Sequence, residues 1–490
     1  MSLLRVLRDR LRGHETGKPS APADPMLPRG SHLAVTWTIP DDYGGMTSAL
    51  LRRSRAFARD TGEPVQILTF DPALDAARAR ARLRTAGELD GGVTLHHLWE
   101  DLAAWPDDAL GVAPDAEPRT YPRVEDGRRS RSEVDDDGAL VRRWHFRPDG
   151  TLAAVEKVRR RGRLVRVYDR AGRPGRRWTS IWHLYADWMD GILPPGPAYV
   201  VVDSKSMVRP FARLERPDTA VAHVVHGAHL SGRADDALGP LSPSRRPFVR
   251  HLDDFDAVVL LTEGQRRDLL QRVGPRDHVH VVPNSTDLPQ VAPDRARDRG
   301  AGAVVAQLSD RKQVDQAVAG YALAAERTGA RMHLDVYGDG PRRAEVEAAA
   351  RRTTGVRLHG YVPRAADRLA KASYLLLTSR SEGLPLVLAE AMSRGCLPIV
   401  YDVRYGPADF ITDGVDGFLV PDGDVEGIAD RLERLLSLDE DDVRRMRHAA
   451  RATAEQYADG AVVARWAQVF RSAAARAEGR HRTATTATAD

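Results

Sequence analysis

Short apolar runs alternate along this chain with longer segments in which apolar residues recur every three or four positions. The first half opens with such runs at 32–38 (HLAVTWT), 65–70 and 93–98. Between them lie a helix-like segment that Thr47 or Ser48 can cap, with apolar residues at Leu50, Leu51 and Phe57, and a second one at 74–89. Apolar runs of this length predict buried strands, and the three-to-four spacing predicts helices. Because strands and helices alternate, we expect a parallel sheet in an α/β domain.

The same rhythm continues to the end of the chain. We predict strands at 199–203, 220–226, 256–262, 278–282, 303–306, 332–337, 356–360, 374–378 and 397–401. Helices are expected at 181–193, 207–214, 263–273, 314–325, 343–352, 425–437 and 440–457. The predicted domains are an N-terminal helix and linker (1–31), two α/β domains (32–290 and 291–458), a last helix (459–476) and a disordered tail (477–490).

Residues 117–180 interrupt this rhythm. Turn pairs recur about every twelve residues, at Asp137-Gly138, Asp149-Gly150, Arg161-Gly162 and Ala171-Gly172, with strand-like segments between them. This pattern predicts an antiparallel β-meander with little core of its own, so Trp144 and Phe146 need cover. The meander packs on its own domain or forms an oligomer interface, and we favour the interface. Its many arginines suit an anionic acceptor, although a solvated face is the default interpretation.

Composition narrows the function classes. The chain has 490 residues, 42% of them hydrophobic, and a net charge of only +4, which gives no global nucleic-acid footprint. Cys396 is the single cysteine, which excludes an internal disulfide and a cysteine metal site and favours the cytoplasm. No apolar run approaches the roughly 18 residues of a spanning helix. A basic amphipathic helix at 1–14 suits either a membrane surface or, as we favour, packing on the body or fraying.

The candidate chemistry is concentrated in 375–421. Glu382 lies in a loop (SEGLP) between a predicted strand and helix, Pro385 suits the first helical position, and Glu390 follows eight residues after Glu382. A helix N-terminus favours anions, and two nearby acids suit the hydroxyls of a ligand that also carries phosphate, as a nucleotide sugar does. The alternative, to which we give equal weight, is that these are simply one solvated and one buried glutamate of an ordinary α/β unit.

Other candidates lie at predicted loops. Gly44 and Gly45 follow the first strand, where a glycine pair lets the backbone approach a ligand; a simple tight turn is the alternative. Lys312 lies where a loop reaches a phosphate, although a surface lysine is the commoner outcome. Carboxyl ends of strands, where open α/β sheets bind ligands, carry Asp203, His226 and Asn284. For His226 and His229, a loop histidine bonded to backbone is the alternative.

Together these residues resemble the retaining glycosyltransferases of glycosyltransferase family 4, which have the GT-B fold of two Rossmann-like domains facing a cleft. The resemblance covers roughly 32–475 except the meander, and is carried by Glu382 and Glu390 in SEGLPLVLAEAM and by GCLPIV, DGVDGFLVPDGD, VYGDGPRR, VRLHGYV, VVPNS and YGGM. With the inserted meander, the chain looks like the subgroup of teichoic-acid poly(glycerol-phosphate) and poly(ribitol-phosphate) glycosyltransferases and Ser-rich-protein GlcNAc-transferases. In that subgroup the insertion drives oligomerisation or acceptor binding.

The resemblance implies roles for the candidate residues. Glu382 would hold the donor sugar, Glu390 the ribose and Lys312 the diphosphate, while His226 would lie beside the sugar. The diphosphate would also meet the backbone of Gly383, Leu384, Pro385 and Leu386, and Gly44 and Gly45 would approach the donor from the other domain. The family usually has an arginine where this chain has Gln307, and Arg311 is the candidate replacement. The implied catalytic residues are Glu382, His226 and Lys312, without a metal or cofactor.

The implied function is transfer of glucose or GlcNAc from a UDP-sugar, with retention, to a hydroxyl of a polymeric acceptor such as a teichoic-acid-like polyol phosphate. One alternative acceptor is a Ser/Thr-rich protein or peptide. A non-catalytic GT-B partner subunit is favoured by Gln307 and opposed by Glu382, Glu390 and Lys312. A sugar-nucleotide epimerase or a phosphorylase is a further alternative. We expect a cytoplasmic homo-oligomer joined through 117–180, with no nucleic-acid partner and at most peripheral membrane contact.

Overall fold

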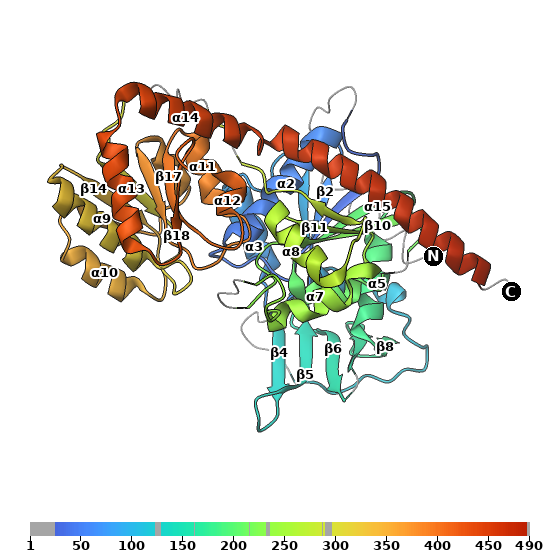
Figure 1. Ribbon diagram of the computed structural model, residues 1–490. Helices are drawn as coiled ribbons and strands as arrows, with labels where there is room; N and C mark the ends of the chain where they lie inside the picture. Colours follow the sequence, from blue (N-terminus) through green and yellow to red (C-terminus); the bar gives the residue numbers. More distant parts are fainter. Residues whose placement is uncertain are drawn as a thin grey trace. The chain divides into compact units, whose positions relative to one another are not determined.

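The computed structural model describes residues 25–122, 129–160, 162–214, 216–231, 236–286, 288–289 and 296–487 (Figure 1). The predicted helix at 1–14 therefore lies outside the described residues. The chain forms two compact units. Unit 1 contains Met1–His223, Pro247–Ala257 and Phe470–Asp490, and unit 2 contains Val224–Arg246 and Val258–Val469. The predicted domain boundary at 290/291 stays a prediction.

A seven-stranded parallel sheet has the order β12-β11-β10-β9-β1-β2-β3. Its strands are β1 (Ser31–Val35), β2 (Val65–Thr69), β3 (Val93–His97), β9 (Ala198–Val202), β10 (Thr219–Val225), β11 (Ala257–Leu260) and β12 (Val279–Val281). Every residue of β9 and β10 is buried, as in parallel sheets covered on both faces. Each of these strands overlaps a run predicted as a strand, with β1, β9 and β10 beginning one residue earlier than predicted, which confirms the α/β prediction.

The helices of this first half differ from the prediction in places. The helix expected to be capped by Thr47 or Ser48 begins earlier, at Gly45, with Gly44 as its cap, and others are shorter than predicted. The helices are α2 (Gly45–Thr61), α3 (Ala76–Thr85), α4 (Leu98–Ala103), α5 (Ile181–Ile192), α6 (Val208–Phe211), α7 (Arg246–Arg250) and α8 (Glu263–Val273). The helix predicted at 74–89 begins at Ala76 because the carboxylate of Asp75 accepts from Arg78 N and caps it.

The β-meander is a five-stranded antiparallel sheet in chain order. Its strands are β4 (Ser130–Val134), β5 (Leu140–Phe146), β6 (Leu152–Arg159), β7 (Gly162–Tyr168) and β8 (Pro174–Trp178). Gly138, Gly150 and Gly172 adopt positive φ angles of 77°, 79° and 82° in the turns between strands, as the turn pairs predicted.

The cover for the meander aromatics comes from within unit 1. Trp144 and Phe146 are 9% and 2% exposed, and they share a buried cluster with Leu152, Val155 and Tyr168. The prediction that the meander has little core of its own was therefore wrong. Because Trp144 and Phe146 are already buried, their need for cover is no longer a reason to expect an oligomer interface. The oligomer itself stays a prediction.

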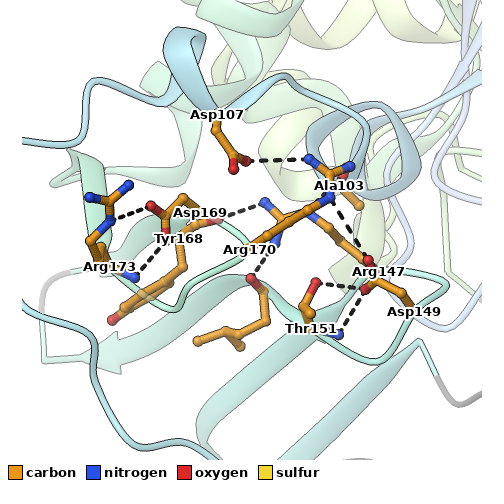
Figure 2. A network of polar contacts seen from close by, with 10 residues as sticks. Ala103, Asp107, Arg147, Asp149, Thr151, Tyr168, Asp169, Arg170 and Arg173 are labelled. Atoms are coloured by element: carbon orange, nitrogen blue, oxygen red, sulfur yellow. Dashed lines mark hydrogen bonds and ion pairs between the residues drawn. The ribbon is translucent and has the colours of Figure 1, made fainter.

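One buried arginine joins the meander to the α/β part of unit 1 (Figure 2). Arg147 is 2% exposed, and its guanidinium donates to the carbonyl oxygens of Ala103 (3.1 Å), Leu152 (2.5 Å) and Tyr168 (2.6 Å). Ala103 ends α4, whereas the other two carbonyls belong to β6 and β7. Three buried backbone acceptors are thus satisfied by one side chain, which fixes the meander against α4.

The second sheet lies wholly in unit 2 and is parallel, with the order β15-β14-β13-β16-β17-β18. Its strands are β13 (Ala301–Val305), β14 (His333–Tyr337), β15 (Val356–Gly360), β16 (Tyr374–Leu377), β17 (Leu397–Asp402) and β18 (Phe418–Pro421). The accompanying helices are α9 (Val314–Thr328), α10 (Arg343–Arg351), α11 (Leu386–Ser393), α12 (Pro407–Phe410), α13 (Val425–Ser437) and α14 (Glu440–Glu455). Cys396, between α11 and β17, is fully buried, and burial raises the pKa of its thiol to about 12.

The last helix is longer than predicted. α15 runs from Asp459 to Ala487, so it includes most of the tail 477–490 that was predicted to be disordered. The guanidinium of Arg480 lies 2.6 Å from the buried carboxylate of Asp256, and Arg476 donates to the carbonyl of Asp253. These contacts within unit 1 stabilise a segment whose polar composition alone suggests disorder. None of the described helices has the length and apolar content needed to cross a membrane.

Candidate active site

The predicted strand, loop and helix around Glu382 are present. β16 ends at Leu377, the loop occupies 378–385, and α11 begins at Leu386. Pro385 was predicted to be the first helical residue of α11. It is instead the N-cap, and the helix begins one residue later, at Leu386. The carboxyl end of β16 and the start of α11 thus place this loop where open α/β sheets bind ligands.

Glu382 is a buried carboxylate held by two cations. Its side chain is 8% exposed; Lys312 Nζ lies 2.5 Å from Oε1 and Arg311 Nη1 lies 3.1 Å from Oε2. Arg311 Nη1 also donates to the carbonyl of Ser381 (3.1 Å). The structure therefore brings Glu382 together with two other predicted donor ligands, Arg311 and Lys312, which lie some 70 residues earlier in the chain.

The charge state of this group follows from its surroundings. Burial alone would raise the pKa of Glu382, but the charges of Lys312 and Arg311 outweigh it and hold that pKa below its ordinary value. Glu382 is therefore ionised at neutral pH and accepts hydrogen bonds rather than donating a proton. One carboxylate and two cations leave a net positive charge, which suits a ligand with both hydroxyls and phosphate.

The loop that carries Lys312 is itself fixed by β16. Thr378 Oγ1, at the end of this strand, donates to the carbonyl oxygen of Gln313 (2.7 Å). Gln313 caps α9 with a φ of +43°. Gln307 lies earlier, after β13, and is exposed, so the position where the resemblance expects an arginine is open to solvent.

The segment containing His226 approaches the Glu382 loop within unit 2. A Cβ added to Gly383 would lie 2.2 Å from the carbonyl oxygen of His226 and 2.9 Å from Gly227 Cα. Only glycine allows this approach. The structure thus places the backbone of His226 against the Glu382 loop, while its role beside a sugar stays a prediction.

The other predicted site residues are less constrained. Glu390 lies partly exposed in α11, and Leu384 is buried in the loop. Gly44 caps α2 with open space where a Cβ would be, and Gly45 begins this helix. Both glycines belong to unit 1, so their approach to a donor stays a prediction.

A cavity of about 420 Å³ in unit 2 borders the loop at Ser381. Its lining includes Asp268, Arg404 and Tyr405, which the sequence analysis did not select. The sequence offers little local indication of them: Asp268 lies in a helix that follows a strand, and Arg404 and Tyr405 lie in the loop after β17. Among the described residues, no group of three or more His, Cys, Asp or Glu side chains is arranged to hold a metal ion.

Another cavity, of about 430 Å³, lies in unit 1 beyond β3. Trp99 and Glu100 from α4 line it, together with His145 and Arg147 from the meander. The rings of Trp99 and His145 stack with centroids 3.5 Å apart. Sequence patterns do not predict this cavity, because segments that are far apart in the chain build it.

Comparison with known proteins gives the family of this region. Residues 302–438 match the family Glycosyl transferases group 1. An exopolysaccharide phosphotransferase of Streptomyces coelicolor is 31% identical over 237 residues, which are 46% of this chain and 24% of that relative's length. A poly(glycerol-phosphate) alpha-glucosyltransferase of Bacillus subtilis is 20% identical over 90% of this chain and 75% of its own length.

Solved structures show the fold. TarM superposes with a TM-score of 0.71 at 16% identity, covering 91% of this chain and 99% of that chain. The pneumococcal O-GlcNAc transferase GtfA, solved with UDP and GlcNAc, has a TM-score of 0.65 at 16% identity and covers 91% and 99% of the two chains. These similarities confirm the predicted GT-B fold class. The segment 302–438, which carries Glu382, Lys312 and Glu390, thus matches the family Glycosyl transferases group 1.

Proposed function

We propose that this chain is a retaining, UDP-sugar-dependent glycosyltransferase that moves glucose or GlcNAc to a hydroxyl of a polymeric acceptor, such as a teichoic-acid-like polyol phosphate. The observation that carries the proposal is the ionised, buried Glu382, which Lys312 and Arg311 hold beside the start of α11. The group 1 domain and the B. subtilis relative support the same reaction class.

A bound donor would replace the ion pairs that Glu382 forms with Lys312 and Arg311. Its diphosphate would take the cations Lys312 and Arg311 and meet the N–H groups at the start of α11, which stabilise developing negative charge. Glu382 would then accept hydrogen bonds from sugar hydroxyls. His226 would line the sugar side, and Glu390 would accept from the ribose hydroxyls.

In the transfer step, the bond between the anomeric carbon and the UDP oxygen breaks and a bond from that carbon to the acceptor oxygen forms. The acceptor proton passes to the departing phosphate. We assign attack from the same face as the leaving group because in this scheme the Glu382 carboxylate accepts hydrogen bonds from the sugar hydroxyls and is not the nucleophile that a double displacement needs. Charge stabilisation by this chain's own Lys312 is the main catalytic contribution in this scheme.

A second acceptor class is supported by the similarity to a pneumococcal O-GlcNAc transferase, which favours a hydroxyl-bearing protein or peptide. The similarity to a phosphotransferase raises another reaction, in which the acceptor oxygen attacks the β-phosphorus of the donor, the sugar phosphate passes to the acceptor and UMP leaves. A non-catalytic partner subunit would bind acceptor without releasing UDP.

One experiment separates these functions. The full chain is incubated with UDP-glucose or UDP-GlcNAc and with glycerol-phosphate oligomers or a Ser/Thr-rich peptide, and products are identified by mass spectrometry. We expect UDP release and a gain of one sugar mass on the glycerol-phosphate oligomers. Sugar on the peptide alone supports the second acceptor class, a gain of one sugar phosphate with release of UMP supports the phosphotransferase, and release of neither UDP nor UMP contradicts the enzyme.

The finer expectations belong to the same proposal. We propose a cytoplasmic homo-oligomer that joins through the meander and needs no metal. Deleting the meander would uncover α4 and α5, so charge substitutions at exposed positions are the better test. Val134→Asp with Val158→Asp, at side chains 56% and 37% exposed, should lower the mass in light scattering if the interface exists. Full activity in EDTA would support metal independence.

A further inference from the structure

Glu382 is held by its backbone as well as by its side chain. Its N–H donates to the carbonyl oxygen of Arg404 (3.3 Å), and its own carbonyl oxygen accepts from the N–H of Tyr405 (3.1 Å). A Cβ on the next residue, Gly406, would lie 2.7 Å from Pro385 Cδ. The segment Arg404–Gly406 is therefore packed directly on the Glu382 loop.

The side chains of Arg404 and Tyr405 both donate to one carboxylate. Asp268 Oδ2, from α8, accepts from Tyr405 Oη (2.8 Å) and from Arg404 Nη1 (2.9 Å). The Asp268 side chain is only 13% exposed, whereas that of Arg404 is 41% exposed. A largely buried carboxylate that accepts charge-assisted bonds is a firm anchor for the segment.

Neighbouring contacts restrict the same segment further. Tyr405 is 4% exposed, and its ring stacks parallel to that of the fully buried His229, with centroids 5.7 Å apart. The N–H of Gly264, one turn before Asp268 in α8, donates to Asp409 Oδ1 (3.1 Å) in α12. Tyr405 is thus fixed on its face by His229 and at its hydroxyl by Asp268.

Charge also favours this arrangement. Burial, and then Asp268, raise the pKa of the Tyr405 hydroxyl, so it stays protonated and donates to the carboxylate. The groups facing Asp268 from the elements around it are Tyr405, Arg404 and His229. Burial lowers the pKa of His229 to about 4, so this ring is neutral at neutral pH, and Arg404 is the cation that pairs with Asp268 among the ion pairs described.

We propose that Asp268 is a positioning residue for Glu382: through Tyr405 and Arg404 it fixes the backbone on both sides of that carboxylate. Removing the anchor frees the loop to move by a fraction of an ångström to an ångström, and displacements of that size cost about 100-fold in rate when a reacting group depends on them. Because Asp268 touches neither cation of Glu382, its effect reaches the site only through the loop.

The first test measures the loop and does not need activity. Hydrogen–deuterium exchange is followed in the full chain for the amides of Glu382 and Tyr405, in wild type, Asp268→Ala and Glu263→Gln. Glu263 is the matched control, since it lies exposed on the same helix and pairs only with Arg266 among the ion pairs described. We expect about tenfold faster exchange in Asp268→Ala alone. Unchanged exchange overturns the inference.

The second test rests on the proposed function and reads turnover. Asp268→Ala should lower kcat at least about tenfold, with UDP affinity within about twofold of wild type. Asp268→Asn, which can still accept from Tyr405 Oη, should recover part of the loss. In a Glu382→Gln background, Asp268→Ala should cause no further loss, because the two residues act as one unit.

The outcomes separate the two proposals. An equal loss from Asp268→Ala in both backgrounds means that it does not act through Glu382 and overturns the inference. If wild type releases no UDP from any UDP-sugar but exchange at Glu382 still responds to Asp268→Ala, the proposed function fails and the positioning role stands.

Discussion

Glu382 and Glu156 are both buried carboxylates paired with cations, but they lie in regions of different construction. Glu156 is fully buried in the middle of β6, 2.6 Å from the guanidinium of Arg163 and 3.7 Å from the ring of His145. Glu382 lies in a loop between a strand end and a helix start, with cations on long side chains that reach it from another loop.

The difference shows what distinguishes a site from a structural ion pair. In both cases burial alone would raise the pKa of the carboxyl, and the neighbouring groups hold it below its ordinary value. The pKa direction therefore does not discriminate. What discriminates is that Lys312 and Arg311 can turn to a ligand without breaking a sheet, whereas the partners of Glu156 lie within antiparallel strands.

The largest effect is expected in the meander region. Arg147→Met removes the donor that three buried carbonyl oxygens share, and each lost partner costs about 1–3 kcal/mol, so the free energy of unfolding should fall by about 3 kcal/mol or more. Chemical denaturation followed by circular dichroism measures this. The control is Arg170→Met, whose exposed pairs with Asp107 and Asp149 should contribute less than about 1 kcal/mol. Equal losses would contradict the anchoring role of Arg147.

The next effect is expected at the loop. Glu382→Gln removes the charge that orients Lys312 and the acceptor for sugar hydroxyls, and we expect turnover to fall about 100-fold, roughly 2.7 kcal/mol in activation free energy. Steady-state UDP release measures it, with the thermal unfolding midpoint as a check on folding. Full turnover in this variant would remove Glu382 from the mechanism.

The matched change in the meander should affect stability instead. Glu156→Gln should cost about 1–2 kcal/mol of unfolding free energy and leave UDP release per folded molecule unchanged. Because the folded-state pKa of Glu156 is lowered, its charge stabilises the fold above the ordinary value of 4.5, and this contribution is lost as the pH falls through the folded-state pKa. The stability difference between wild type and variant should therefore be constant near neutral pH and shrink below about pH 4.5. A difference that grows in acid would reverse the assignment.

The smallest effect concerns the departure from the family pattern. Gln307→Arg places a guanidinium at an exposed position after β13, where the resemblance expects one to grip the diphosphate. An exposed ion pair contributes about 0.2–1 kcal/mol, so UDP affinity should rise by no more than about fivefold. Isothermal titration calorimetry with UDP checks this. Weaker binding would show that Arg311 already occupies the place of that arginine.

Much of the fold could be predicted from local sequence patterns. Apolar runs such as 220–226 give buried parallel strands because period and length are properties of the segment itself. The Gly138, Gly150 and Gly172 turns follow from the positive φ that each requires. Motif spacing likewise placed Glu382 in a loop and Glu390 on the following helix.

Pairings across long stretches of chain could not be predicted in this way. Arg147 bonding to Ala103, and Asp268 bonding to Tyr405, join segments 44 and 137 residues apart, and neither distance leaves a periodic signal. The length of α15 likewise depends on a tertiary contact, the ion pair between Arg480 and Asp256. The resemblance selected Lys312 for a phosphate, but not its bond to Glu382 in the free protein.

The single cysteine has a practical consequence for experiments in solution. Cys396 is fully buried and its thiol has a pKa of about 12, so maleimide reagents, which react with exposed thiolates, should leave it unlabelled in the folded chain. A cysteine introduced on the surface of each unit would then be the only attachment points for a fluorophore pair. Energy transfer between such dyes would report the distance between units 1 and 2 as UDP is added, without removing any native residue.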